Sequence, residues 1–370
     1  MKILGLDIGG ANTKYALLEN KQKEDSVLCY DSDFFPIWKQ YDNYGHYLHS
    51  LYKKLLEKFT HIDVIVSVIT AELADCFETK KEGITKISKT IDKVFLEKGL
   101  AKKALIYSVS GRFLSRKKAI SKWMEVAAAN WHAAAKYIGL LYPNCIIIDI
   151  GSTTTDIIPV HRGNIVSKGR NDLTRLQNSE LVYTGLLRTN VATIVSKISL
   201  HSKEIPVASE LFATTGDVYF ILGEITKKEF TTETVNNKPI TKNYSSNRLA
   251  RIICADTNML NAEDICDIAR QIKEQQFTKI QKALRIVQNR YINDYKFEPP
   301  LVLVGSGTQA IGIPLMKKIQ AKKWTTLTDK FPKKLLEILP AFAVAKLFIH
   351  QKKKKSKLMR YKNVEENNCL

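Results

Sequence analysis

The stretch DIGGANT at Asp7–Thr13 has a counterpart in DIGSTTT at Asp149–Thr155. In each copy an apolar run leads into Asp-Ile-Gly, small or polar residues follow, and a second run begins at a threonine. Glycine and small residues allow a tight turn between two strands. The two stretches therefore predict two strand–turn–strand hairpins of the same construction, far apart in the chain.

Turns of this kind are suited to binding phosphate, because backbone N–H groups can point inward where no side chain blocks them. Serine and threonine add hydroxyl donors. The predicted phosphate-binding residues of the turns are Gly9, Gly10, Asn12, Gly151, Ser152, Thr153 and Thr154. The alternative is a pair of ordinary glycine turns, and the recurrence of Asp, Gly and Thr at matching positions argues against it.

Asp7 and Asp149 end the first strand of each predicted hairpin. A carboxylate cannot bind phosphate itself, but it can hold a hydrated Mg²⁺ that neutralises phosphate charge. We therefore predict both aspartates as catalytic, metal-binding residues, with a turn-capping role as the structural alternative.

The duplication predicts an α/β fold of two lobes with related cores and a cleft between them. The expected first lobe spans residues 1–143 and the second 144–350, while the basic segment 351–370 is expected to be disordered. The Ala-rich stretch Trp123–Ile138 lacks Gly and Pro and predicts one continuous helix. A later strand runs into Gly305-Ser306-Gly307, a third glycine site.

The net charge of +20 favours anionic partners, and seven of the basic residues lie in 351–370. Lysines solvated on helix faces are the alternative explanation. The sequence has no nucleic-acid recognition motif, and its six cysteines lack zinc or redox spacing. We expect neither a secretory signal nor a membrane span of about 20 apolar residues. The expectation is a cytoplasmic protein with small anionic ligands, without nucleic-acid or membrane partners; its oligomeric state stays open.

The paired loops and the late Gly-Ser-Gly resemble the actin, sugar-kinase and heat-shock-chaperone ATPase superfamily, and the DIGSTTTDIIP string at Asp149–Pro159 resembles its hydantoinase/oxoprolinase branch. Further motifs resemble the methanofuran-pathway synthases, also described as tetrahydromethanopterin-linked C1-transfer pathway proteins. These motifs are DIGGANTK (Asp7–Lys14), TAELAD (Thr70–Asp75), AAANW (Ala127–Trp131), ELVYTGLLRTNV (Glu180–Val191), GDVY (Gly216–Tyr219) and RLARIICAD (Arg248–Asp256). The resemblance implies a duplicated ribonuclease-H-like fold.

The resemblance also implies a reaction. The family joins an (aminomethyl)furan-methanol diphosphate to the phenolic oxygen of γ-glutamyltyramine, which releases diphosphate and forms an aryl ether. Mg²⁺ eases departure of diphosphate, and the phenol, with a pKa of about 10, must lose its proton as the bond forms. ATP is not expected as a cofactor. The same loops would also suit the phosphates of ATP, so an ATP-dependent small-molecule kinase or a hydantoinase/oxoprolinase-like ATPase is the alternative.

Several residues receive roles from this likeness. Lys14 occupies the place of a phosphate-contacting lysine in actin-like proteins, and Asp156 is a candidate base or second metal-side carboxylate. Arg188 is expected to bind the glutamyl carboxylate or diphosphate, with a structural salt bridge as the alternative. The remaining predicted substrate-binding residues are Thr189, Asp217, Gly305 and Gly307.

Overall fold

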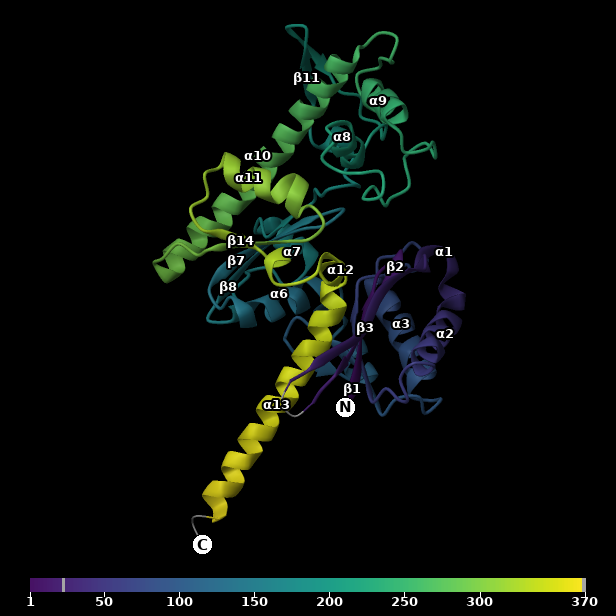
Figure 1. Cartoon of the computed structure of the whole chain (residues 1–370), viewed down its shortest axis with the longest axis vertical. Coiled ribbons are helices and arrows are strands. Elements are labelled where there is room, and N and C mark those ends of the chain that lie inside the picture. The colour runs from purple at the N-terminus through teal and green to yellow at the C-terminus, as the bar shows by residue number, and fades with distance from the viewer. Residues whose placement is uncertain (22–23, 368–370) are drawn as a thin grey trace.

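The computed structural model describes residues 1–21 and 24–367, with side chains up to Lys354. It contains two large mixed sheets with helices on both faces of each (Figure 1). In the described part of the chain no helix is long and apolar enough to cross a bilayer.

The first sheet has the order β3-β2-β1-β4-β5-β6. Its strands are β1 (Lys2–Ile8), β2 (Asn12–Glu19), β3 (Ser26–Phe34), β4 (Val64–Ile69), β5 (Lys103–Tyr107) and β6 (Phe113–Leu114). The helices of this half are α1 (Ile37–Gln40), α2 (Tyr44–Leu56), α3 (Lys80–Phe95), α4 (Arg116–Ser121), α5 (Trp123–Val126) and α6 (Asn130–Leu141).

The second sheet has the order β10-β8-β7-β13-β14, with β9 also paired to β8. Its strands are β7 (Cys145–Ile150), β8 (Thr155–His161), β9 (Asn164–Ile165), β10 (Leu181–Val182), β13 (Leu301–Val304) and β14 (Trp324–Thr326). Helices α7 (Asp172–Gln177), α10 (Ala262–Tyr295), α11 (Ile313–Lys318), α12 (Lys333–Glu337) and α13 (Leu339–Asn367) follow in this half.

Both sheets share one topology. In the first, β1, β2 and β3 form an antiparallel meander and β4 and β5 join β1 in parallel. In the second, β7, β8 and β9 form the meander and β13 and β14 join in parallel. The repeated order confirms the predicted two-lobed, duplicated ribonuclease-H-like fold.

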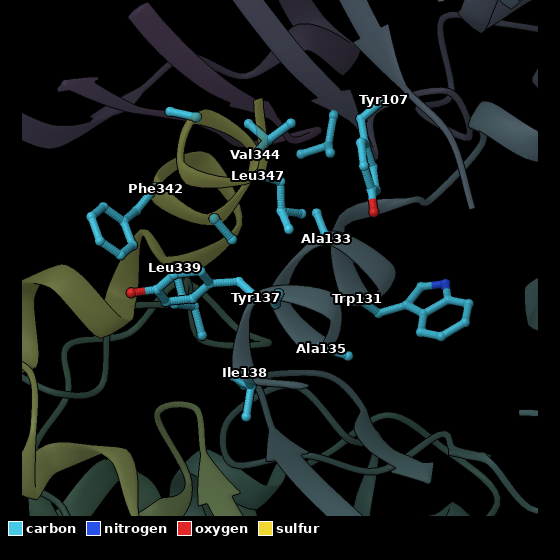
Figure 2. Packing of buried hydrophobic residues seen from close by; sticks show 14 of the residues in the cluster. Tyr107, Trp131, Ala133, Ala135, Tyr137, Ile138, Leu339, Phe342, Val344 and Leu347 are labelled. Atoms are coloured by element: carbon cyan, nitrogen blue, oxygen red, sulfur yellow. The ribbon is translucent and has the colours of Figure 1, made fainter. Parts of the chain in front are cut away.

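The two sheets meet at a shared core. Alternation along β1 sends Leu4 and Leu6 towards α2 and α3, and Ile3 towards the opposite face. That opposite face packs on α6 and α13, which also contact the apolar face of the second sheet, including Ile147 and Val302. Figure 2 shows the α6 and α13 side chains that form this layer.

Helix α13 makes an unusually close approach to the first sheet, although it ends the chain. A side chain at Gly5 of β1 would place its Cβ 2.0 Å from the carbonyl oxygen of Ala341. Glycine therefore allows β1 and α13 to touch backbone to backbone. The chain thus returns from the second half to cover the first sheet, and α13 then extends away from the body (Figure 1).

A smaller unit packs on the N-terminal half of α10. It consists of β11 (Lys197–Leu200), β12 (Lys203–Pro206), α8 (Thr215–Ile221) and α9 (Lys242–Arg251). These elements bury their own apolar cluster against α10.

Two sequence-based expectations differ from the structure. The helix expected over Trp123–Ile138 is broken between α5 and α6, where Ala128 has a φ of +50° and Ala127 bridges Ile69. This tertiary contact outweighs the helix propensity of the alanines. The segment 351–370, expected to be disordered, continues α13 as far as Asn367, in a stretch rich in helix-forming lysines and free of Gly and Pro; residues 368–370 lie outside the described chain.

Candidate functional site

The first turn, between β1 and β2, exposes backbone donors. The N–H of Gly9 closes it by donating to the Asn12 carbonyl at 3.0 Å. The Gly10 and Ala11 carbonyls accept from the backbone N–H groups of residues 37 and 35 at 2.8 and 3.0 Å. Within the described chain, the N–H groups of Gly10 and Ala11 have no backbone acceptor outside regular secondary structure. The turn thus has its carbonyls tied back and its N–H groups available to an anion.

The second turn, between β7 and β8, is built in the same way. The N–H of Gly151 donates to the Thr154 carbonyl at 2.9 Å. The carbonyls of Gly151 and Ser152 accept from the backbone N–H groups of residues 186–188, each at 2.9 Å. The hydroxyls of Ser152 and Thr153 lie 3.5 Å apart and have no other partner among the described residues. This turn therefore offers hydroxyl donors as well as backbone ones.

A glycine brings the segment after β10 close enough to hold the second turn. A Cβ on Gly185 would lie 2.6 Å from the Gly151 carbonyl oxygen and 2.7 Å from the Ser152 carbonyl carbon. The buried amide of Gln276, on α10, fixes this segment by donating to the Gly185 carbonyl and the Thr184 hydroxyl, both at 2.9 Å. Sequence reasoning gave Gln276 no role, because its partners lie about ninety positions away.

The strand-end aspartates are arranged as predicted at the start of each turn. Asp7 is 4% exposed, and its Oδ1 has no hydrogen-bond partner in the described structure. Burial raises the pKa of Asp7, while Lys14, with Nζ 3.9 Å from Oδ2, opposes the rise. Burial, followed by the charge of Asp156, raises the pKa of Asp149 to about 7, and Lys14 again lowers it. Lys14 thus lowers the pKa of both aspartates.

The register of the hairpins explains which charged residue lies next to each aspartate. Asp7 pairs with Lys14 across β1 and β2, and Asp149 pairs with Asp156 at the same position of β7 and β8. Directly opposed residues share a sheet face and interact. The duplicated site therefore has a lysine opposite one aspartate and an acid opposite the other.

Asp156, a predicted base or metal-side carboxylate, forms an ion pair with an arginine. Arg175 of α7 is 1% exposed and donates to Asp156 Oδ1 at 2.7 Å and to the Glu180 carbonyl at 3.0 Å. Its guanidinium also stacks on the Trp131 ring, 3.9 Å from the centroid. A buried charge of this kind needs such a partner, so the pair accounts for Asp156 structurally.

The third glycine loop lies against the second turn. Gly305 has a φ of +93°, and a Cβ there would lie 2.4 Å from Asp149 Oδ1. Gly307 donates its N–H to the Ile150 carbonyl at 2.8 Å. The five residues that follow, Thr308–Gly312, form a π-helix before α11. Both glycines were predicted to bind substrate; in the structure they let this loop pack on the end of β7 beside Asp149.

Three other predicted substrate residues differ in availability. The Arg188 side chain is exposed and has no hydrogen-bond or ion-pair partner among the described side chains. The Thr189 hydroxyl accepts from the Gly185 N–H at 2.9 Å, inside its own loop. Asp217 is 1% exposed, caps α8 and forms a 2.6 Å ion pair with Arg248. Arg188 thus stays available to a ligand, whereas Thr189 and Asp217 are engaged inside the protein.

Another acid at the lobe boundary had no predicted role. Glu72 is 1% exposed, and its Oε2 has no hydrogen-bond partner in the described structure. It lies within the quoted TAELAD motif at Thr70–Asp75, the one signal in the sequence that could have drawn attention to it. Burial is the largest cause of a rise in the pKa of Glu72 to about 7.

The residues fit a hydrated divalent cation better than a fully protein-ligated one. No three His, Cys, Asp or Glu side chains of the described chain gather into a metal-binding group. Mg²⁺ commonly binds through one or two carboxylates plus water and substrate phosphates. The unpartnered Oδ1 of Asp7 and the carboxylate of Asp149 meet that requirement.

Comparisons with known proteins identify the family. The hydantoinase/oxoprolinase family profile matches residues 63–324. The (4-{4-[2-(gamma-L-glutamylamino)ethyl]phenoxymethyl}furan-2-yl)methanamine synthase of Methanocaldococcus jannaschii is 35% identical over 353 residues, 94% of this chain and 98% of that protein. The synthase of the same name from Methanococcus vannielii is 31% identical over 204 residues, 55% of this chain and 89% of its own.

Among solved structures, nucleotide-free acetone carboxylase aligns with a TM-score of 0.48 and 12% identity, over 93% of this chain and 70% of that one. This likeness is too distant to carry an inference about function. The family match and the near full-length relative are decisive, and the chain belongs to the hydantoinase/oxoprolinase family, together with these methanamine synthases.

Proposed function

We propose that this protein joins an (aminomethyl)furan-methanol diphosphate to the phenolic oxygen of γ-glutamyltyramine, with release of diphosphate. The observation that carries the proposal is the pair of matching turns whose aspartates both lie within the influence of Lys14. The product named for the relatives is a phenoxymethyl furan with a γ-glutamylamino group, which is the ether this reaction forms.

The groups of the site divide between the two substrates. The free N–H groups of both turns, the hydroxyls of Ser152 and Thr153 and the ammonium of Lys14 suit the diphosphate. The exposed guanidinium of Arg188 suits the glutamyl carboxylate, because it has no protein partner among the described residues. In the reaction, the phenol oxygen bonds to the furan methylene carbon, and the bond from that carbon to diphosphate breaks.

A magnesium ion held by Asp7 and Asp149 would neutralise the departing diphosphate. Asp7 and Asp149 are thus the proposed cation ligands, and they leave most of the coordination positions to water and substrate. The protein's own donors do the rest, because they hold the leaving group in a fixed position while the carbon–oxygen bond breaks.

The test is a turnover assay with purified protein. Diphosphate and the aryl ether should form only when both substrates and Mg²⁺ are present, without ATP, and a chelator should stop the reaction until Mg²⁺ is restored. Transfer or hydrolysis of the γ-phosphate of ATP, with no ether formed from the two substrates, would instead identify a kinase or ATPase.

A further inference from the structure

Glu72 lies beyond the carboxyl ends of β1 and β4, the end of the first sheet where the β1–β2 turn also lies. Strands β1 and β4 run parallel with Asp7 opposite Val68, so the segment after β4 leaves the sheet beside Asp7. Thr70 confirms this position, because its N–H and hydroxyl reach the Ile8 carbonyl at 2.8 and 3.3 Å. Glu72 follows two residues later, buried and with Oε2 unpartnered among the described residues.

Charged groups from both lobes influence this carboxylate. Lys80, at the start of α3, forms a 3.3 Å ion pair across the lobe boundary with Asp172, at the start of α7. Both charges act on Glu72: Lys80 favours its charged form and Asp172 opposes it. Asp172 also raises the pKa of Asp156, so Glu72 and Asp156 share a charged neighbour.

The backbone near Glu72 adopts a strained conformation. Ala128 has a φ of +50°, in the left-handed region that is unfavourable for a residue with a side chain. The backbone N–H of Glu72 itself, followed by that of Ala128, favours the charged carboxylate. Strain of this kind is found at functional sites, where it holds a group in a required direction. Here the strained residue lies beside a carboxylate that the Lys80 charge also favours in its ionised form.

The other candidate bases near the two turns already have a protein partner or a proposed role. Asp156 is paired with Arg175. His132 is buried and lies 3.0 Å from the Tyr107 hydroxyl, and burial lowers its pKa to about 3, so the imidazole binds a proton weakly. Asp7 and Asp149 are the proposed cation ligands. Glu72 keeps a free oxygen at the boundary where the lobes meet.

We propose that Glu72 accepts the phenolic proton while the aryl ether forms. As the phenol oxygen bonds to the furan carbon, the O–H bond breaks and its proton moves to Glu72, while the electron pair of the cleaved carbon–oxygen bond leaves with diphosphate. This role rests on the proposed function. A base is most effective when its pKa lies near the working pH, and burial brings that of Glu72 to about 7.

The test compares two phenols in the whole protein. One is γ-glutamyltyramine, and the other is a ring-fluorinated analogue whose phenol is already ionised at neutral pH. Glu72→Gln should lower kcat about 100-fold or more with the natural phenol, and less than about tenfold with the analogue, because a proton acceptor matters less there. The wild-type kcat should rise with pH through about 7, and this rise should vanish in the variant.

Glu125→Gln is the matched control. Glu125 also has a buried, unpartnered Oε2, but its neighbours Lys122 and Arg112 belong to the first lobe, and its replacement should leave kcat unchanged. Thermal unfolding and binding of the furan diphosphate show whether Glu72→Gln is folded, and Glu72→Asp should restore part of the rate. Equal losses for both phenols, or an unchanged pH profile, would overturn the role of Glu72. Absence of ether formation by the wild type would instead overturn the proposed function, and this role with it.

Discussion

Lys14 lies directly opposite Asp7 in the β1–β2 pair, with Nζ 3.9 Å from Oδ2. The same ammonium lowers the pKa of Asp149 on the second sheet. One lysine therefore links the acids of both turns before any substrate arrives. A diphosphate bound between the turns would find this positive charge beside its oxygens, which leads to the first prediction.

Replacement of Lys14 by Met should weaken the diphosphate substrate selectively. Loss of one charge-assisted contact is worth roughly 10- to 100-fold in affinity. We expect KM for the furan diphosphate to rise by about that factor, while KM for γ-glutamyltyramine changes little. Steady-state kinetics with each substrate varied in turn measures this. Equal changes for both substrates would show that Lys14 does not serve the diphosphate in particular.

Replacement of Arg188 by Ala should have the opposite selectivity. The exposed guanidinium has no protein partner in the described structure, so its removal should leave thermal stability unchanged. KM for γ-glutamyltyramine should rise about 10- to 100-fold, since a charged contact is lost. Tyramine, which lacks the glutamyl carboxylate, should react equally well with both proteins. A rise confined to the furan diphosphate would reassign Arg188 to the leaving group.

The repeated Asp-Ile-Gly pattern was enough to predict the fold. Local information suffices there, because a strand, a glycine turn and a second strand are consecutive in sequence, and their recurrence implies a duplicated sheet. The pattern also placed Asp7 and Asp149 at matching strand ends, where the structure has them.

The engagement of other residues could not be read from the sequence. Asp156 and Asp217 have arginine partners 19 and 31 positions away, and only the folded chain brings each pair together. Glu72 was missed for a similar reason, since burial gives it a raised pKa and burial is a property of the folded chain. Ala127 shows the same limit for the backbone, because its bridge to Ile69 of β4 interrupts a sequence that favours helix.

Two glycines at the site should respond differently to a methyl group. A Cβ on Gly10 would meet no atom within 4 Å, so Gly10→Ala should fold normally and obstruct only the approach of phosphate to the turn. We expect KM for the furan diphosphate to rise on the order of tenfold with little change in thermal unfolding.

Gly305→Ala is the comparison. Its φ of +93° and a Cβ 2.4 Å from Asp149 Oδ1 should destabilise the fold and displace the carboxylate. We expect a loss on the order of 2 kcal/mol in the free energy of unfolding together with a fall in kcat. If Gly10→Ala unfolded at a lower temperature than the wild type while Gly305→Ala did not, the described packing around these two glycines would be wrong.

Glu72 should make the stability of the protein depend on pH in an unusual direction. Its folded-state pKa is about 7, against 4.5 for an unperturbed glutamate. Between pH 4.5 and 7 the folded state holds a proton on Glu72 that the unfolded state has released. The free energy of unfolding therefore falls as pH rises through this range, and above the folded-state pKa the full cost of a buried, ionised Glu72 is present. Glu72→Gln cannot ionise. The variant should therefore gain stability relative to the wild type between pH 5 and 8, by on the order of 3 kcal/mol. Urea unfolding at pH 5 and at pH 8 measures the difference.

Glu125→Gln provides the control. The Lys122 ammonium lowers the pKa of Glu125, so the stabilising charge of Glu125 is lost only in acid and is present throughout this range. A Glu72→Gln difference that stays constant from pH 5 to 8, as expected for the control, would show that Glu72 is already ionised in the folded protein and has no raised pKa with which to receive a proton.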